Sequence, residues 1–399
     1  MIDLFRRYLR NLQKLCYRFF WQNCFLSCLF IVLFIYYLAT NSPIGSAFLN
    51  NYLPFLYKEQ QGNEQNYLVG FQSPVSDELI CNGELMAMPY FLNGKHLGFG
   101  KRFDCGLLQY LSKLKLLKNQ MDISVKPKSF QNLDVVFLTY SSTNHFTESR
   151  AAINKLRTSG IENKIIFYDL GLQSDQKAEL QSVCNLELRK FNFSSYPGFV
   201  YRLTKYYFKP LAIAEVFKDY DAIWVMDTSV RFLNKSNLLH FYDRVRSGAV
   251  EPFVIRRPSS HGIFATTKEG MYDYLPIDKD IAKNRSMFDA NSMFIVKSAF
   301  SRDAVKWNAL CALTKDCMDP SGSTLYCRFK KERYSEFAKC HRFDQSSINI
   351  ILTSLKEQQR MPYIGHFIPN ISDSFDPFLD VRREDRLKAN KLNLPCKQT

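Results

Sequence analysis

Residues 222–232 read Ala-Ile-Trp-Val-Met-Asp-Thr-Ser-Val-Arg-Phe, an apolar run that ends at Asp227. A continuous apolar run of this kind is typical of a strand buried on both faces in a parallel sheet. In open α/β sheets ligands bind beyond the carboxyl ends of the strands, which is where Asp227 lies. A carboxylate there can hold a divalent cation that bridges two phosphates, but aspartate also follows strands as a turn or cap residue. Taken alone, this segment leaves both interpretations open.

The chain around this segment alternates strand and helix patterns. Apolar runs predict strands at 133–140, 164–168, 186–191 and 222–226, and amphipathic runs predict helices at 147–159, 174–183 and, after Pro210, 211–217. Strands that alternate with helices predict an α/β fold with a parallel sheet and helices on both faces. Asp289, Ala290 and Asn291 precede the apolar stretch 293–296, which predicts a loop before a further strand.

A second polar group opens an apolar, helical run near the C-terminal end. Asp344, Gln345 and Asn349 stand at the start of this run. A helix there would bury one apolar side, formed by Ile348, Ile351, Leu352 and Leu355. Asp344 or Ser346 would cap its first turn, so a purely structural role for Asp344 stays open.

The N-terminal segment predicts a membrane anchor. Residues 19–39 carry no charged side chain and are long enough to cross a bilayer. Five basic residues and one acid within 1–18 place that tail in the cytosol by the positive-inside rule. Small residues at 41–47 leave a cleaved signal peptide as the alternative, although the long basic and apolar regions favour an anchor. The predicted organisation is completed by a stem at 40–75 and a lumenal domain at 76–399.

This topology predicts a single-pass type II protein of the Golgi or endoplasmic reticulum membrane, because one short span suits the thinner membranes of the early secretory pathway. Four acceptor triplets predict N-glycosylation, at Asn192, Asn234, Asn284 and Asn370. Such triplets also arise by chance. The compartment therefore depends mainly on the N-terminal pattern.

Eight of the 11 cysteines lie beyond the apolar span, where an oxidising lumen lets them pair. Four form a cluster, at Cys311, Cys317, Cys327 and Cys340. Their wide and irregular spacing favours disulfides over a zinc site. We expect two disulfides here, and the sequence leaves all three pairings open.

Basic residues exceed acidic ones, 53 against 38, which gives a formal net charge of +15. Most of this excess lies beyond the apolar span, on the predicted lumenal side. It suits a nucleotide-sugar donor and an acidic glycan, while the topology disfavours nucleic acid. The membrane, a nucleotide sugar and a glycan, glycoprotein or glycolipid acceptor are the predicted partners.

Several of these motifs carry a resemblance to a known class of enzymes. The strand before residues 227–229, the later segment 344–349 and Gly365-His366 are similar to nucleotide-diphospho-sugar glycosyltransferases of the GT-A type. The likeness is to the retaining, glycogenin-like and galactosyltransferase-like group. Segments 168–172, 209–211 and 340–345 resemble more closely a poorly characterised, nematode-rich family of single-span, glycosyltransferase-like proteins. This second resemblance covers roughly residues 80–375.

The resemblance implies a GT-A-like, Rossmann-type fold with a mixed, mainly parallel sheet, and a hexosyltransferase-like activity. In the better-known group an Asp-any-Asp motif and a later histidine bind manganese and the nucleotide diphosphate. This implies a divalent metal, Mn or Mg, at Asp227 and His366, and a donor at Asp227 and Ser229. Ser229 replaces the second acid and is a poorer ligand, which puts metal dependence in question. Asp344 and Gln345 would face the sugar as catalytic residues.

Two weaker candidates accompany these residues. Lys209 precedes a helix that leads to the strand ending at Asp227, so it could meet the donor diphosphate, although exposed, solvated lysines are commoner. His341 would either act in the site or pack beside a disulfide of Cys340. Two functions therefore stay open: a glycosyltransferase, or a catalytically inactive, membrane-anchored carbohydrate-binding or scaffold protein on the same fold.

Overall fold

The computed structural model describes residues 75–120, 134–246, 250–359, 379–382, 390–392 and 394. The chain divides into two compact units, 1–68 and 69–399, and all described residues belong to the second. The predicted tail (1–18), anchor (19–39) and all but the last residue of the stem (40–75) lie outside the described residues. Among the helices that are described, none is both long and apolar enough to cross a membrane.

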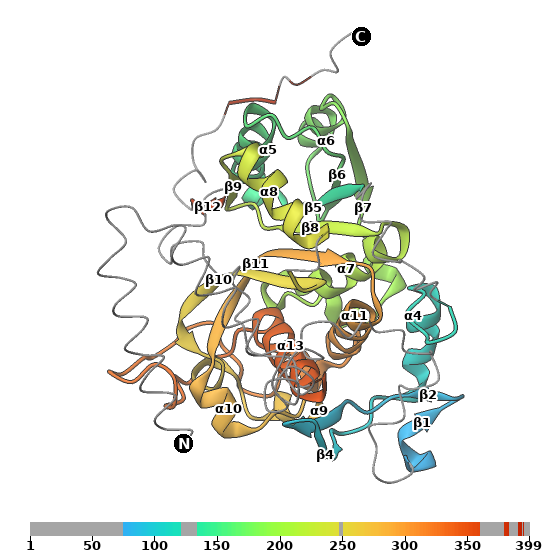
Figure 1. Ribbon diagram of the computed structural model, residues 1–399. Helices are drawn as coiled ribbons and strands as arrows, with labels where there is room; N and C mark the ends of the chain where they lie inside the picture. The colour runs from blue at the N-terminus through green and yellow to red at the C-terminus, as the bar shows by residue number, and fades with distance from the viewer. Residues whose placement is uncertain are drawn as a thin grey trace, which may run out of the picture. The chain divides into compact units, whose positions relative to one another are not determined.

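A six-stranded mixed sheet forms the centre of this unit (Figure 1). Its strands are β5 (Val135–Ser141), β6 (Ile165–Asp169), β7 (Leu186–Lys190), β8 (Ala222–Met226), β10 (Phe253–Gly262) and β11 (Ser286–Val296). The order is β10-β11-β8-β5-β6-β7. The pairs β8-β5, β5-β6 and β6-β7 are parallel, whereas β11 is antiparallel to both of its neighbours. The prediction of a mixed, mainly parallel sheet is confirmed.

Helices cover both faces of the sheet, as predicted. The larger helices are α5 (Phe146–Thr158), α6 (Ser174–Gln181), α7 (Phe208–Asp219), α8 (Lys235–Arg246), α11 (Ala299–Ala312) and α13 (Asp344–Gln359). On β8, Ile223 and Val225 join the core formed with α7, α11 and α13, while Trp224 joins the core formed with α5 and α8. This alternation follows from the two-residue period of a strand. Figure 1 shows the two groups of helices on opposite sides of the sheet.

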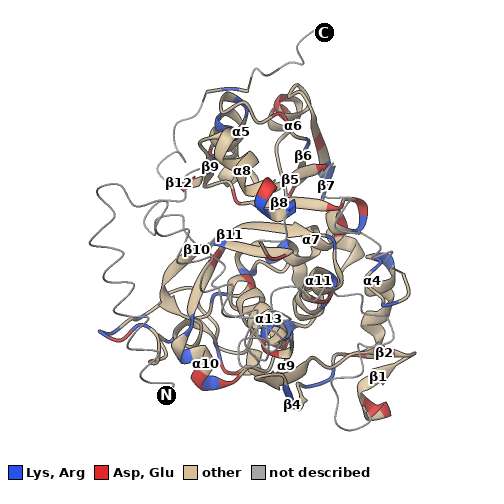
Figure 2. Cartoon of the chain, viewed as in Figure 1, with Lys and Arg blue, Asp and Glu red and all other residues tan. Residues whose placement is uncertain are grey.

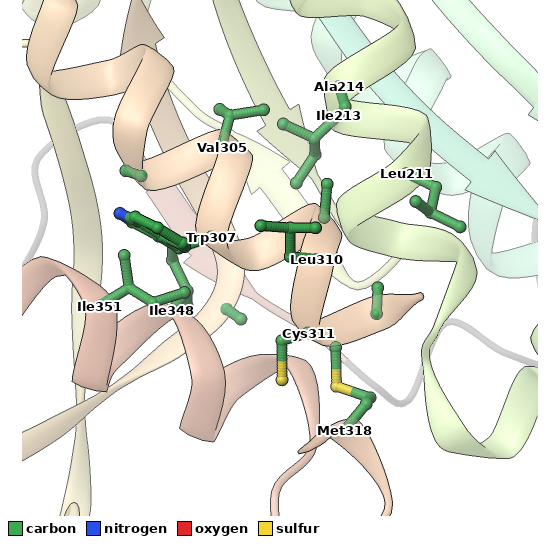
Figure 3. Packing of buried hydrophobic residues seen from close by; sticks show 14 of the residues in the cluster. Leu211, Ile213, Ala214, Val305, Trp307, Leu310, Cys311, Met318, Ile348 and Ile351 are labelled. Atoms are coloured by element: carbon green, nitrogen blue, oxygen red, sulfur yellow. The ribbon is translucent and has the colours of Figure 1, made fainter. Parts of the chain in front are cut away.

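The core beneath α7 and α11 also holds α13 in place. Figure 3 shows Leu211 of α7, Trp307 and Leu310 of α11, and Ile348 and Ile351 of α13 converging in one cluster. Full burial of such side chains contributes roughly 1.5–3 kcal/mol each. The four apolar residues predicted to face the core from this helix, Ile348, Ile351, Leu352 and Leu355, are all buried.

Smaller elements complete the described unit. The short helices are α4 (Leu108–Lys113), α9 (Gly270–Tyr274), α10 (Lys279–Asn284) and α12 (Lys315–Met318). The 3-10 turns are η3 (Asp77–Leu79), η4 (Cys105–Leu107), η6 (Thr143–His145), η7 (Phe193–Ser195), η8 (Gly198–Tyr201), η9 (Leu203–Lys205) and η10 (Phe264–Thr266). Three two-stranded ribbons pair β1 (Ile80–Cys81) with β2 (Glu84–Leu85), β3 (Pro89–Leu92) with β4 (Lys95–Phe99), and β9 (Val230–Phe232) with β12 (Leu379–Val381).

One predicted loop is wrong. Residues 289–291 belong to β11, which begins at Ser286 rather than after Asn291. Asp289 pairs with Arg257 of β10, so the antiparallel partner extends the strand through polar residues that a hydrophobic pattern does not count. The predicted strand 222–226 has the bounds of β8, and the other predicted elements begin within three residues of the observed ones.

The cysteine cluster forms two disulfides, as predicted. Cys311 bonds to Cys317 and joins α11 to α12, while Cys327 bonds to Cys340, four residues before α13. A third bond joins Cys81 to Cys105, and Cys184 is also disulfide-bonded. The pairing follows sequence order, an outcome that the spacing alone could not select.

Asn349 fixes the start of α13 to the sheet. Its Oδ1 accepts the N–H of Phe288 at 2.8 Å, and its Nδ2 donates to the carbonyl of Phe288 at 2.8 Å and to that of Gln345 at 2.8 Å. The amide thus acts as a strand partner for one residue of β11. Its role is structural, and it sets the position of Asp344 relative to β11.

We expect Asn349→Ala to lower the free energy of unfolding by about 3 kcal/mol, because it removes two buried hydrogen bonds to the backbone of Phe288 and one to that of Gln345. Urea unfolding measures this change. Asn154→Ala is the matched control, since Asn154 lies on a helix and makes one longer hydrogen bond of 3.3 Å. It should cost less than about 0.5 kcal/mol, and equal losses in both variants would contradict the assignment.

Candidate active site

The ammonium of Lys209 lies between two carboxylates at the carboxyl end of β8. Its Nζ is 3.0 Å from Asp227 Oδ1 and 2.9 Å from Asp344 Oδ2, and it donates to the carbonyl of Ala290 at 3.1 Å. The side chain of Lys209 is 4% exposed and that of Asp344 8%, whereas that of Asp227 is 29% exposed. Three of the predicted site residues therefore meet in one cluster, which is reached from solvent at Asp227.

The backbone before each helix aims these side chains at one another. Lys209 is the second residue of α7, and Asp344 is the first residue of α13. Each follows closely after a non-glycine residue in the left-handed region, Tyr206 at φ 58° and Phe343 at φ 43°. The rings of Tyr206 and Phe343 lie 6.3 Å apart. These two strained turns pack against each other beside the cluster, which is where such strain is commonly found in enzymes.

Tyr140 completes the surroundings of Asp227. The Tyr140 hydroxyl, on the adjacent parallel strand β5, donates to Asp227 Oδ1 at 2.6 Å. The Asp227 N–H donates to the carbonyl of Asn291 on β11 at 2.8 Å. Lys209 Nζ lies 5.6 Å from the ring centroids of both Tyr140 and Tyr206, within the range of a cation–π contact. Strands on both sides of β8 thus hold the carboxylate in position.

Charge and burial act against each other in this cluster. Burial alone would lower the pKa of Lys209, but the carboxylates of Asp227 and Asp344 outweigh it and raise that pKa well above its usual value. Burial raises the pKa of Asp344; Lys209 opposes this shift and the charge of Asp227 adds to it. Burial and the charge of Asp227 raise the pKa of Tyr140. Lys209 is therefore a fixed cation, and Tyr140 a neutral hydroxyl donor.

Gln345 is held by two residues that are distant from it in the sequence, Ser259 and Asp289. Its Nε2 donates to Ser259 Oγ at 2.8 Å and to Asp289 Oδ1 at 3.2 Å. The hydroxyl of Ser259 donates to the same oxygen of Asp289. Asp289 and Ser259 thus orient the Gln345 amide next to Asp344.

The other predicted metal and donor ligands do not build a metal site within the described residues. Ser229 lies beyond β8 and is buried, and its carbonyl accepts the N–H of Arg382 at 2.9 Å. His366 lies outside the described residues. Across the described ranges, no group of three or more His, Cys, Asp or Glu side chains is placed to hold a metal ion. The carboxylate of Asp227 is already bound by Lys209 and Tyr140, so it does not form a metal site by itself.

The prediction that the Lys209 side chain is solvated is wrong. Lys209 is buried because α7 presents apolar side chains around it and two acids offset its charge. Tyr140 was missed. It ends the predicted strand beside Asp227, and the carboxyl ends of neighbouring parallel strands meet, so the pattern did contain a signal for it.

The predicted glycosylation sites lie on the surface where they are described. Asn192, Asn234 and Asn284 are exposed, and Asn370 lies outside the described residues. Asn234 Oδ1 accepts the N–H of Asn237 at 3.2 Å at the start of α8. Exposure is what modification of these three residues requires, and glycosylation itself stays a prediction.

The family described as "Protein of unknown function (DUF1647)" matches residues 84–214. This range includes Lys209 but ends before Asp227 and Asp344. No curated protein matches the chain.

The solved structures to which this chain is similar include several glycosyltransferases. The galactosyltransferase LgtC, in complex with donor and acceptor sugar analogs, is 15% identical with a TM-score of 0.33, covering 54% of this chain and 70% of that one. Mouse xyloside xylosyltransferase 1 is 12% identical with a TM-score of 0.32, and the match covers 56% of this chain and 83% of that one. The mannosyltransferase Ktr4p from S. cerevisiae, in complex with GDP, is 12% identical with a TM-score of 0.32, and the match covers 64% of this chain and 78% of that one. The predicted resemblance to GT-A type glycosyltransferases is confirmed as a resemblance.

Lys209→Met should lower the free energy of unfolding by about 3 kcal/mol, because it leaves two carboxylates, one of them deeply buried, without a cation. Chemical denaturation measures the loss. The double variant K209M/D344N should recover part of it, since it removes the more buried charge. Additive losses in the double variant would show that the two residues do not interact.

His341 has a structural role, and this can be tested by its pH dependence. Its Nδ1 accepts the N–H of Lys268 at 3.1 Å, and its Nε2 donates to the carbonyl of Met318 at 3.1 Å. Burial lowers the pKa of His341 from 6.5 to about 3. Between these values the unfolded chain binds a proton that the folded chain does not, so stability falls as the pH is lowered.

We therefore expect His341→Gln, which keeps a donor and an acceptor but cannot titrate, to flatten this dependence. Between about pH 7 and about pH 5, the free energy of unfolding of the wild-type chain should fall more steeply than that of the variant, by up to about 1.4 kcal/mol per pH unit. Urea unfolding at several pH values compares the two slopes. Parallel slopes would mean that His341 titrates normally in the folded protein.

Proposed function

We propose that this chain is a glycosyltransferase that moves a sugar from a nucleotide-sugar donor to a glycan, protein or lipid acceptor. The observation that carries the proposal is the buried ammonium of Lys209 between Asp227 and Asp344. The cluster lies at the carboxyl end of β8, where ligands bind in α/β sheets. A buried ammonium held between two carboxylates, one of which is partly exposed, suits a site that handles charged intermediates.

The charge of the cluster matches the chemistry of glycosyl transfer. When the bond between the anomeric carbon and the donor diphosphate breaks, positive charge develops on the sugar. Two ionised carboxylates and one ammonium carry a net negative charge, and fixed charges shielded from water stabilise an opposite charge that develops beside them. We assign Asp344, the more buried carboxylate, to this role.

The remaining residues position the substrate. Gln345, oriented by Ser259 and Asp289, is assigned to the hydroxyls of the transferred sugar. Asp227, the most exposed of the three charged residues, is assigned to the donor side with Ser229 beside it. Lys209 keeps both carboxylates in place and offsets part of their charge as a diphosphate approaches. Mn or Mg at Asp227 and His366 stays a prediction.

We place this activity in the lumen of the Golgi or the endoplasmic reticulum, with the chain as a type II membrane protein. Disulfides form in such an oxidising compartment, and the described unit contains three complete ones. Three exposed acceptor asparagines agree with it. The anchor on which this placement depends lies outside the described residues.

A donor-hydrolysis screen of the purified full-length chain with several nucleotide sugars tests the proposal. Asp227→Asn and Asp344→Asn should each lower turnover at least about 100-fold, because each keeps shape and removes a charge from the site. Asp344→Asn should affect nucleotide binding less than Asp227→Asn. Asp175→Asn, at an exposed position at the start of α6, is the control and should leave the rate unchanged.

Wild-type turnover in the Asp227→Asn variant would make this assignment wrong. Glycan binding by a wild-type chain that hydrolyses no donor would favour the alternative, a carbohydrate-binding or scaffold protein. Ser229, in place of a second acid, is the residue that keeps this alternative open.

A further inference from the structure

The disulfide between Cys327 and Cys340 closes a surface loop, residues 327–340, that we call the basic loop. It contains five basic residues, Arg328, Lys330, Lys331, Arg333 and Lys339. Glu332 and Glu336 are its two acids, so its formal net charge is +3. Figure 2 shows the loop as a projection beside β10 with bands of basic residues.

Aromatic side chains are exposed along this loop and just before it. Tyr326 is 72% exposed and Phe337 38%. The guanidinium of Arg328 lies 6.0 Å from the ring centroid of Tyr326, and the ammonium of Lys268 lies 6.0 Å from that of Phe337. Each ring has a cation beside it, and a ring with a polar or charged neighbour is the kind of side chain that is enriched at binding surfaces.

The basic loop is held in one conformation. Arg328 N–H donates to the carbonyl of Ala338 at 2.7 Å, and Ala338 N–H donates to that of Ala265 at 2.8 Å. Gly262 packs so closely on Tyr334 that an added Cβ would lie 2.9 Å from it. A preorganised loop loses little entropy when it binds a ligand.

Strand β10 connects the basic loop to the candidate active site. Ser259 accepts from Gln345 in the site, and the next residue, Ser260, accepts from Arg333 Nη2 of the loop at 3.1 Å. The following residue of β10, His261, stacks on Phe329 of the loop with ring centroids 5.3 Å apart. Because a strand advances about 3.3 Å per residue, the loop begins within the length of a few sugar units from Gln345.

We propose that the basic loop is the acceptor-binding surface and that the acceptor is an anionic glycan. The proposal rests on the proposed glycosyltransferase function. Sugar rings stack on Tyr326 and Phe337, and the carboxylate or sulfate groups of the glycan pair with the exposed Lys331 and Lys339. Charge complementarity of this kind selects the partner and speeds its association.

A glycan fits this surface better than a membrane lipid does. An acceptor must present a hydroxyl at the reacting carbon while the rest of the molecule is held outside. The loop is linked to Gln345 through two neighbouring serines, as such an acceptor requires. An anionic membrane needs only a basic face and gives no reason for this connection.

The test measures binding of hyaluronan, chondroitin sulfate and neutral chitin hexasaccharides to the full-length chain by calorimetry at low salt. Hyaluronan carries carboxylates alone and chondroitin sulfate adds sulfates, so the pair separates the two anionic groups. K331E/K339E should weaken binding of the anionic sugars about tenfold. K113E/K190E, which makes the same charge change at exposed lysines of α4 and β7, should not. Tyr326→Ala should weaken the binding of all three hexasaccharides, because it removes a ring on which a sugar stacks.

Equal losses in K331E/K339E and K113E/K190E would overturn the proposal, because they would reflect net charge alone. Binding of phosphatidylserine vesicles, lost in K331E/K339E, without binding of any hexasaccharide would also overturn it in favour of a membrane contact. Donor hydrolysis without acceptor separates this inference from the proposed function. A chain that hydrolyses donor but binds glycan equally in all variants refutes the loop assignment alone. Loss of glycan binding in K331E/K339E, with no donor hydrolysis in the wild type, supports the loop and refutes the enzyme.

Discussion

The ion pairs of Lys209 are the constraint on which the rest of the site depends. A lysine ammonium with almost no exposure stays charged only when nearby anions replace the water it has lost. Asp227 and Asp344 supply those anions from the end of β8 and the start of α13. Two helices and a strand must therefore meet within hydrogen-bonding distance, and the packing of α7, α11 and α13 makes this meeting stable.

The turns before the two helices show what this arrangement costs. Tyr206 and Phe343 hold left-handed backbone angles, and for such side chains this conformation costs roughly 1–2 kcal/mol each. Their surroundings sustain the strain. The Cys327–Cys340 disulfide and the buried His341 fix the chain just before Phe343, and Asn349 ties α13 to β11 just after it. Backbone strain at Tyr206 and Phe343 thus lowers the stability of the fold at the two positions that orient Lys209 and Asp344.

Local patterns in the sequence predicted the parts of this site that depend on local chemistry. The apolar run of β8 and the apolar face of α13 located Asp227 and Asp344 correctly, because hydrophobic periodicity reports burial directly. The burial of Lys209 could not be predicted, since its partners come from distant parts of the chain and an isolated lysine is usually exposed. The strand at 289–291 was missed for a related reason: pairing with β10, rather than local hydrophobicity, makes it a strand.

The opposite charges of the site and the basic loop fit a single ligand in one orientation only. The cluster of Lys209, Asp227 and Asp344 carries a net negative charge when both acids are ionised. In the proposed function Lys209 offsets part of that charge for the donor diphosphate, whereas an acidic group beside the reacting hydroxyl of the acceptor would be repelled. The basic loop, at the other end of the Ser259–Ser260 connection, attracts such a group. An acceptor that bears its acidic groups away from its reacting hydroxyl satisfies both charges at once, whereas one with an acid on the reacting sugar does not. If the basic loop binds the acceptor as proposed, the separation of charge along β10 selects the position of acidic groups on that acceptor, in addition to their presence.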